Sequence, residues 1–388
     1  MHKIKLMNKI SSRGIECFNQ HYIVGEEVEE EDAILVRSAS LHDYSFPTNL
    51  KAIARAGAGV NNIPIEACSE KGIVVFNTPG ANANAVKELV LCSLFLASRK
   101  VVEGIAWVNR QSGNEDEDIA SLAEKQKANY VGPEIDGKTL GIIGLGAIGV
   151  AVANAATKLG MNVLGYDPFL SVNAAWGMSK WVKNAESLDV IFKESDYISI
   201  HVPSTKETKG FINADSFKKM KDGVRILNFA RGDLIDNTAL LAALDSHKVE
   251  RYISDFIVNE LIGKENVIFM PHLGASTPES EDNCAKMATE QIIDYLENGN
   301  INHSVNFPRV VQARESKTRI CLTNKNVPNI LARISKLFAD HHVNIENMVN
   351  RSKADYAYTL IDTNEEIRQD IIDRIKSIEG VISVRVLK

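Results

Sequence analysis

The chain has 388 residues, of which 45% are hydrophobic and 24% are charged, and its formal net charge at pH 7 is −6. These values predict a soluble globular protein of two or three domains, and without a Lys/Arg-rich run they argue against nucleic acid as the main partner. The N-terminal segment lacks the apolar core of a signal peptide, and no apolar stretch is long enough to predict a membrane span. Five scattered cysteines indicate a reducing cytoplasm and neither a disulfide framework nor a metal site.

Four stretches follow one another along the chain. Residues 1–97 alternate short apolar runs with helical segments, and residues 98–278 continue this alternation, which predicts parallel βαβ units. One helix is expected over Cys284–Glu297, ending at the Asn298-Gly299-Asn300 turn. The polar segment 309–317 is predicted to be a linker, and residues 318–388 a small separate domain. The fold class is therefore α/β.

A glycine-rich turn in the second stretch carries the strongest signal. Gly144-Leu145-Gly146-Ala147-Ile148-Gly149 lies between the apolar strand Leu140–Ile143 and a helix over Val150–Leu159. In a dinucleotide fold the three glycines permit a tight turn, close approach of a pyrophosphate and close packing of helix on strand. The free N–H groups at the helix start favour phosphate. The alternative is a glycine-rich turn in an unrelated α/β protein.

An acidic residue follows this motif at the spacing expected for ribose recognition. The next strand, Met161–Tyr166, ends at Asp167, where a carboxylate would bond the adenosine ribose hydroxyls. Because a carboxylate repels a 2′-phosphate, NAD is predicted in preference to NADP.

Polar residues recur where the later strands end. Tyr197–Ile200 ends at His201-Val202-Pro203, Arg225–Phe229 at Ala230-Arg231-Gly232, Tyr252–Ser254 at Asp255, and Val267–Met270 at Pro271-His272. Open parallel sheets bind ligands beyond the carboxyl ends of their strands. We therefore expect these residues to share one cleft.

Three of the charged residues suit the oxidation of an alcohol. His272 could take the hydroxyl proton, because imidazole titrates near neutrality, and Glu260 could orient that ring. Arg231 could bind both oxygens of a substrate carboxylate through its planar guanidinium group. The alternatives are a histidine bonded to backbone, a solvated loop acid and a surface salt bridge.

These motifs together resemble the D-isomer-specific 2-hydroxyacid dehydrogenases. The matching segments are Gly144–Gly149 with Tyr166-Asp167-Pro168, Asn228–Asp236, Pro271–Thr277, Arg55–Ile63 and Asn77–Gly80. The resemblance implies two Rossmann-like parallel-sheet domains: a substrate-binding domain of residues 1–97, completed by 279–308, and an NAD-binding domain of residues 98–278. It also implies an acid–base pair of His272 and Glu260, with Arg231 on the substrate carboxylate.

The resemblance extends to contacts with cofactor and substrate. The residues expected to contact NAD are Thr78, Gly144, Gly146, Ala147, Ile148, Gly149, Asp167, His201, Val202, Pro203, Phe229, Ala230, Asp255, Gly274 and Ala275. Substrate contacts are expected from Arg37, Arg55, Gly57, Ala58, Gly59 and Asn61. Departures from the family pattern are Leu261 in place of the proline after the catalytic Glu, Asn61 in place of an aspartate, and no tryptophan near Lys125 and Lys127.

The last stretch predicts the order βαββαβ and resembles the ACT domain. Expected strands are Thr318–Leu322, Ile345–Asn350, Tyr356–Ile361 and Val381–Leu387, and the two helices carry isoleucines at helical spacing. The positions that match effector contacts of serine-binding relatives are Asn324, Asn326 and Asn344. The resemblance therefore implies L-serine as a possible effector, with a purely dimerising role as the alternative.

The resemblance implies NAD-dependent oxidation of the small-molecule substrate 3-phosphoglycerate to 3-phosphohydroxypyruvate, at the start of serine synthesis, by a cytoplasmic homodimer or homotetramer. One alternative keeps the chemistry but changes the substrate to glyoxylate, hydroxypyruvate or another small 2-hydroxy acid. Another is a non-catalytic protein that senses NAD.

Overall fold

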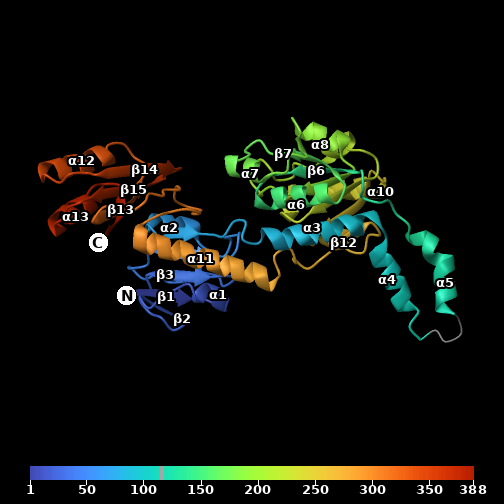
Figure 1. Ribbon diagram of the computed structural model, residues 1–388, viewed down its shortest axis with the longest axis horizontal. Coiled ribbons are helices and arrows are strands. Elements are labelled where there is room, and N and C mark those ends of the chain that lie inside the picture. The colour runs from blue at the N-terminus through green and yellow to red at the C-terminus, as the bar shows by residue number, and fades with distance from the viewer. Residues whose placement is uncertain (114–117) are drawn as a thin grey trace. The chain divides into compact units, whose positions relative to one another are not determined.

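The computed structural model describes residues 1–113 and 118–388 (Figure 1). It forms two compact units: unit 1 comprises Met1–Asn82 and Pro278–Lys388, and unit 2 comprises Ala83–Thr277. Unit 1 holds a five-stranded parallel sheet and a four-stranded antiparallel sheet, and unit 2 holds a seven-stranded parallel sheet. The predicted α/β class, with two parallel-sheet domains and a small C-terminal domain, is confirmed.

Unit 2 is built around the order β12-β11-β10-β9-β6-β7-β8. Its strands are β6 (Thr139–Ile143), β7 (Asn162–Tyr166), β8 (Val182–Asn184), β9 (Tyr197–Ile200), β10 (Val224–Asn228), β11 (Val249–Ser254) and β12 (Val267–Phe269). Its helices are α3 (Ala83–Ser98), α4 (Val101–Arg110), α5 (Ile119–Gln126), η1 (Lys127–Tyr130), α6 (Ala147–Lys158), α7 (Val172–Gly177), α8 (Leu188–Glu194), α9 (Ala214–Lys219), η2 (Gly232–Leu234), α10 (Asn237–Asp245) and η3 (Asn259–Leu261). The strand order reverses at β6, and ligands bind at such a point in open α/β sheets.

Helix α3 belongs to unit 2 because of its packing. Val90 and Leu94 of α3 are fully buried in one cluster with Leu140 and Ile142 of β6. The apolar face of the helix therefore covers the seven-stranded sheet. The structure places the start of this unit at Ala83, earlier than the boundary predicted after residue 97.

The N-terminal part of unit 1 has the order β2-β1-β3-β4-β5. Its elements are β1 (His2–Leu6), α1 (Ser12–Ile15), β2 (Tyr22–Gly25), β3 (Ala33–Val36), β4 (Ala52–Arg55), α2 (Ile65–Glu70) and β5 (Val74–Phe76), and α11 (Pro278–Asn298) returns to it from later in the chain. Ala288 and Ile292 of α11 are buried against Leu35 and Ala54 of the sheet. Helix α11 therefore completes the core of this sheet.

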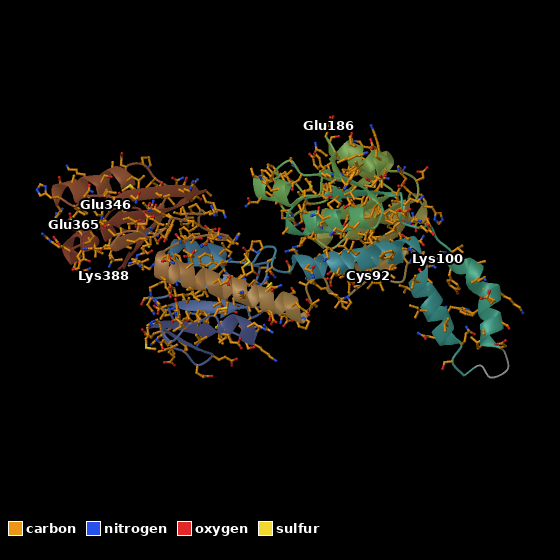
Figure 2. All side chains as sticks on the ribbon, in the orientation of Figure 1. Cys92, Lys100, Glu186, Glu346, Glu365 and Lys388 are labelled. Atoms are coloured by element: carbon orange, nitrogen blue, oxygen red, sulfur yellow. The ribbon has the colours of Figure 1, made fainter. Side chains whose placement is uncertain are left out.

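The C-terminal part of unit 1 has the predicted βαββαβ order. Its elements are β13 (Thr318–Lys325), α12 (Ile330–Asp340), β14 (Asn347–Lys353), β15 (Tyr356–Thr363), α13 (Gln369–Lys376) and β16 (Val381–Leu387), and the sheet order is β14-β15-β13-β16. Ile334 of α12 and Ile375 of α13 are fully buried against Ile320 and Leu322 of β13. Charged Glu346, Glu365 and Lys388 lie exposed on the outside (Figure 2).

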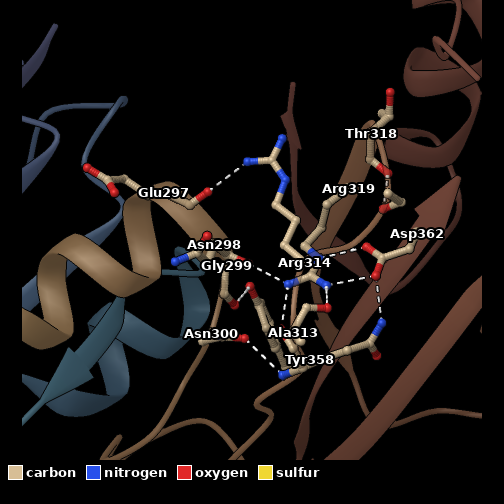
Figure 3. Close-up of polar contacts among 12 residues, drawn as sticks. Glu297, Asn298, Gly299, Asn300, Ala313, Arg314, Thr318, Arg319, Tyr358 and Asp362 are labelled. Carbon is tan, nitrogen blue, oxygen red and sulfur yellow. Dashed lines mark hydrogen bonds and ion pairs between the residues drawn. The ribbon is translucent and has the colours of Figure 1, made fainter. Parts of the chain in front are cut away.

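The segment 309–317, predicted as a linker, is fixed by a buried ion pair next to it (Figure 3). The Arg319 side chain has no exposed surface, and its guanidinium donates to Asp362 Oδ1 at 2.6 Å and Asp362 Oδ2 at 2.7 Å. It also donates to the carbonyls of Asn298 (2.9 Å), Gln312 (2.9 Å) and Ala313 (2.8 Å). These five bonds use all five N–H donors of an arginine.

Side chains from this segment and the C-terminal sheet also cap the end of α11. Arg385 donates to the carbonyl of Tyr295 at 2.7 Å, Arg314 to that of Glu297 at 3.1 Å, and the Tyr358 hydroxyl to that of Gly299 at 2.7 Å. The last carbonyls of a helix have no partner within the helix. Here residues beyond the helix supply those partners. In the described part of the chain, no helix is long and apolar enough to cross a membrane.

Candidate active site

The glycine-rich turn between β6 and α6 has the geometry that its sequence predicts. Gly144 has φ +94°, a left-handed conformation that favours glycine, and a Cβ there would lie 2.7 Å from the carbonyl oxygen of His201. A Cβ at Gly149 would lie 1.9 Å from the carbonyl oxygen of Gly144. The first and third glycines are therefore required by the fold itself.

The second glycine fits an incoming dinucleotide. Gly146 is the N-cap of α6, it is exposed, and a Cβ placed on it would meet nothing within 4 Å. No side chain caps this helix end, and Ala147 after it is also exposed. Uncapped amides at a helix N-terminus bind phosphate groups. The open backbone at Gly146 and the uncapped amides of Ala147 and Ile148 thus fit the pyrophosphate of NAD.

Asp167 follows β7 and faces the same turn. Its Oδ2 accepts the N–H of Leu145 at 2.8 Å, and its Oδ1 accepts the N–H of Phe169 at 2.8 Å. The carboxylate therefore holds the glycine-rich turn against the end of the neighbouring strand. Its predicted bond to the ribose hydroxyls would add to this role.

His201 lies largely buried where β9 ends. Its Nε2 is 2.8 Å from the Ser199 hydroxyl, and burial lowers the pKa of its imidazole to about 4. A Cβ at Gly144 would also lie 2.9 Å from Cγ1 of Val202. His201, with its lowered pKa, and Val202 thus lie against the glycine-rich turn. Pro203 follows them in the chain.

Asn228 fixes the segment that carries Arg231. Fully buried at the end of β10, Asn228 donates from Nδ2 to the carbonyl of Arg231 at 2.9 Å, and its Oδ1 accepts the N–H of Ala230 at 3.2 Å. Phe229 is buried between them in the chain, whereas the Arg231 side chain is exposed. The guanidinium is thus presented to solvent on a fixed backbone.

Asp255 lies between the two predicted catalytic strand ends. It is 3% exposed, and its Oδ2 accepts the N–H of Gly274, the residue before Ala275, at 2.9 Å. Burial raises the pKa of the Asp255 carboxyl, and the nearby charges of His272 and Arg231 oppose this. Among the described residues its buried Oδ1 has no hydrogen-bond partner, so it can accept a donor from a bound cofactor.

His272 occupies an unusual backbone conformation after β12. Its φ is +50°, and its N–H donates to the carbonyls of Asp255 at 3.2 Å and Met270 at 2.9 Å. The ring of Phe256 contacts the imidazole, with 4.9 Å between centroids. Glu260 is exposed in η3, and no hydrogen bond or ion pair joins it to His272 among the described residues. The acid–base pair stays a prediction.

Candidate substrate residues of unit 1 lie around the ends of β3 and β4. Arg37 forms an ion pair with Glu281 at 2.6 Å, and the Arg55 Nε donates to the carbonyl of Arg37 at 3.0 Å. A Cβ at Gly57 would lie 2.6 Å from the Arg55 guanidinium. The Arg55 side chain therefore contacts the backbone of Arg37, and the phosphate role of both residues stays a prediction.

The backbone carbonyls of the rest of this loop are held by two side chains and one backbone N–H. The carbonyl of Ala58 accepts from Asn77 at 2.7 Å, and that of Asn61 is 2.9 Å from His42 Nε2. Thr78 donates its N–H to the carbonyl of Gly57 at 3.1 Å, and its buried hydroxyl has no partner in the part of the chain that the structure describes. Gly59 lies within the same loop.

The three candidate effector residues make separate local bonds. Asn324 donates to the carbonyl of Lys325 at 2.7 Å, Asn326 to that of Ala354 at 3.1 Å, and Asn344 to Glu346 Oε1 at 2.9 Å. Asn324 is 3% exposed, and within residues 1–113 and 118–388 its Oδ1 has no hydrogen-bond partner. Outside the C-terminal domain, Lys127 of unit 2 pairs with Glu124 at 2.5 Å.

Sequence reasoning missed Phe256 and gave Asn228 no role. Asn228 could have been found from its place at a strand end, three residues before Arg231. Phe256 offered no such signal, because a phenylalanine after a buried strand usually belongs to the hydrophobic core.

Comparison with known proteins places these features in a family. Residues 91–274 match the family model "D-isomer specific 2-hydroxyacid dehydrogenase, NAD binding domain", and residues 320–380 match the ACT domain. The middle of the chain is a D-isomer-specific 2-hydroxyacid dehydrogenase NAD-binding domain. An ACT domain follows it. The expected cofactor, NAD, is confirmed for this family.

Individual relatives agree with this family. The D-3-phosphoglycerate dehydrogenase of Archaeoglobus fulgidus is 36% identical over 294 residues, which are 73% of this chain and 53% of that protein. The chain thus spans about half the length of the curated relatives it matches. An NAD+-bound 3-phosphoglycerate dehydrogenase of Entamoeba histolytica is similar in structure (TM-score 0.59, 27% identity, 79% of this chain and 98% of that one). A glyoxylate reductase of Paecilomyes thermophila is also similar (TM-score 0.64, 26% identity, 78% and 98%).

Proposed function

We propose that this protein oxidises D-3-phosphoglycerate to 3-phosphohydroxypyruvate with NAD, as a D-3-phosphoglycerate dehydrogenase. One observation carries the proposal: Arg231, Asp255 and His272 follow the neighbouring strands β10, β11 and β12, beside a turn that fits a dinucleotide. Neighbouring strands lie about 5 Å apart. A cation, a carboxyl group and an imidazole therefore meet at one edge of the sheet.

Each side chain has a part in the proposed reaction. Arg231, exposed on a backbone held by Asn228, binds the substrate carboxylate. His272 takes the proton of the 2-hydroxyl group, and Glu260 turns toward it when substrate binds, because catalytic hydrogen bonds often tighten only in the substrate complex. The turn at Gly146 and the amides of Ala147 and Ile148 would hold NAD, which would supply the hydride acceptor for that carbon.

The phosphate distinguishes the proposed substrate from other 2-hydroxy acids. Arg37 and Arg55 lie on neighbouring strand ends, where the Arg55 Nε donates to the backbone carbonyl of Arg37, and arginines favour a dianionic phosphate. The carboxylate of Glu281 partly neutralises the positive charge of Arg37, so a substrate phosphate would compete with that carboxylate. The alternative substrate is glyoxylate or hydroxypyruvate, as the similar glyoxylate reductase suggests.

Substrate comparison tests the proposal directly. We expect NADH consumption, followed by absorbance, to be faster at low concentration with 3-phosphohydroxypyruvate than with hydroxypyruvate or glyoxylate. Equal efficiency on all three would leave a general 2-oxo acid reductase and remove the phosphate role of the two arginines. No turnover of any of them would favour a protein that only senses NAD.

His272 provides a second test. We expect His272→Ala to lower kcat by about 100-fold or more, the usual effect of losing an acid–base group. The Kd for NADH, measured by fluorescence, should stay nearly unchanged, because the dinucleotide turn is formed by other residues. Turnover that survives the substitution would mean that another group carries the proton.

Regulation and assembly extend the proposal. We propose that L-serine binds at the ACT domain near Asn324, whose buried Oδ1 lacks a partner, and that the protein acts in the cytoplasm as a homodimer or homotetramer. Isothermal titration with L-serine and a rate assay test the effector. Neither heat nor inhibition would leave the domain with a purely dimerising role.

A further inference from the structure

The two predicted catalytic segments are separated by one aromatic side chain, Phe256. Its ring centroid lies 4.9 Å from that of the His272 imidazole, with an angle of 51° between the planes. A Cβ built on Gly232, the residue after Arg231, would lie 3.3 Å from the Phe256 Cβ. Phe256 therefore fills the space between the turn that carries the guanidinium and the turn that carries the imidazole.

The backbone of Phe256 is fixed to both strands beneath it. Its N–H donates to the Ser254 hydroxyl at 3.0 Å, and that hydroxyl donates to the carbonyl of Asn228 at 2.8 Å. Asn228 in turn holds the carbonyl of Arg231 at 2.9 Å. One chain of bonds thus fixes the backbone of Phe256 and the Arg231 turn with respect to each other.

The His272 side chain has little else to hold it. Its backbone N–H is bonded, but no hydrogen bond to either imidazole nitrogen is found among the residues that the structure describes. The side chain is exposed, so its rotamers are not limited by surrounding core. The ring contact with Phe256 therefore restricts the imidazole, beside its charge interaction with Asp255.

We propose that Phe256 is a positioning residue that holds the His272 imidazole toward the Arg231 side of the site. The inference rests on the proposed dehydrogenase function for its kinetic consequence, while the ring contact itself does not depend on it. A tilted aromatic pair is worth about 1 kcal/mol beyond its buried area, enough to favour one rotamer several-fold. A misplaced catalytic group can cost up to about 100-fold in rate.

Gly232 has a specific part in this arrangement. A side chain at position 232 would press on Phe256, because the Cβ-to-Cβ distance would be only 3.3 Å. Glycine at this position leaves room for the ring. Gly232→Ala is thus expected to disturb His272 without touching it.

The experiment compares Phe256→Leu with Phe256→Tyr and with the control Phe269→Leu, whose ring contacts Tyr252 instead. We expect Phe256→Leu to lower kcat about tenfold with an unchanged Kd for NADH, and Phe256→Tyr, which keeps the ring, to restore it. In a His272→Ala background, Phe256→Leu should cause no further loss, because the two changes remove the same interaction. An additive loss, or full activity of Phe256→Leu, would overturn the proposal.

A spectroscopic measurement separates this inference from the proposed function. The imidazole C–H signals of His272, identified by their loss in His272→Ala, should shift in Phe256→Leu and not in Phe269→Leu, because the ring current of Phe256 is removed. Signals that do not move would refute the contact whatever the activity. If they move but no 2-oxo acid is turned over by the unaltered protein, the proposed function fails and the positioning contact stands.

Discussion

Asp167 combines a structural and a predicted recognition role in one carboxylate. Both of its oxygens accept backbone N–H groups, from Leu145 and from Phe169. The same negative charge would exclude the 2′-phosphate of NADP. These two roles can be separated, because an amide keeps one acceptor oxygen but loses the charge.

We expect Asp167→Asn to lower the preference for NAD over NADP, and to lower the melting temperature less than Asp167→Ala does, because the amide keeps one of the two acceptor oxygens. Asp167→Ala removes the acceptors as well, so it should lower both the cofactor preference and the melting temperature. The ratio of kcat/KM values for the two cofactors measures the first effect. An unchanged ratio in both variants would show that another group reads the ribose.

His201 makes the stability of the protein depend on pH. Burial lowers the pKa of its imidazole to about 4, whereas the free side chain titrates near 6.5. Between these values the unfolded chain binds a proton that the folded protein does not, so the free energy of unfolding falls as the pH is lowered. The loss is at most about 3 kcal/mol by pH 4, and it is absent above pH 6.5.

Urea unfolding at several pH values measures this effect. We expect His201→Gln to flatten the curve between pH 6.5 and 4, and the exposed control His21→Gln to leave it unchanged. If both variants keep the slope of the unaltered protein, the titrating group lies elsewhere.

At this scale the sequence predicted where residues lie better than what they contact. Arg231, Asp255 and His272 were assigned to strand ends from the chain order alone, and they lie there. The contact of Phe256 with His272 joins two loops, and a pattern along one chain carries no information about such a contact. The local bonds of Asp167 were missed for the same reason.

Two glycines in the turn between β6 and α6 are needed for different reasons, one for packing and one for ligand approach. Gly149 is buried and has no room for a Cβ, while Gly146 is exposed and has open space in front of it. Packing therefore explains the first glycine, and ligand approach explains the second. The fold and the cofactor each require one of them.

We expect Gly149→Ala to lower the melting temperature strongly, because its Cβ would lie 1.9 Å from the Gly144 carbonyl oxygen. Gly146→Ala should fold normally but bind NADH more weakly, because its methyl group would fill the space for the pyrophosphate. Thermal unfolding and a fluorescence titration measure the two effects. Normal NADH binding by Gly146→Ala would contradict the fit of the dinucleotide to this turn.

Element boundaries followed the sequence where apolar runs marked them. β9 and β16 have the predicted bounds, Tyr197–Ile200 and Val381–Leu387. Helix α11 begins at Pro278, not at Cys284, because its first turn carries proline and the acidic Glu279 and Glu281. Such residues suit a helix N-terminus but show no apolar periodicity.

On the scale of the molecule, a single buried ion pair joins three parts of unit 1. Arg319 of β13 bonds Asp362 of β15, the segment before β13 and the end of α11. We expect Arg319→Met to lower the free energy of unfolding by about 3–5 kcal/mol, because Asp362 would be left buried without its cation. Urea unfolding followed by circular dichroism measures the change.

The matched control is Lys218→Met, which removes an exposed ion pair with Asp215. Its effect on unfolding should be small, because solvent screens such pairs. A double variant, Arg319→Met with Asp362→Leu, should recover much of the lost stability. Failure to recover it would mean that the bonds to the three carbonyls matter more than the charge pair.

The capped end of α11 has a consequence for the modularity of the protein. A domain that can be exchanged between enzymes must leave the rest of the enzyme folded when it is removed. Here the carbonyls of Tyr295, Glu297, Asn298 and Gly299 receive their donors from Arg385, Arg314, Arg319 and Tyr358. Excising residues 318–388 would remove three of these donors, Arg319, Tyr358 and Arg385, so a graft between homologues has to carry them along.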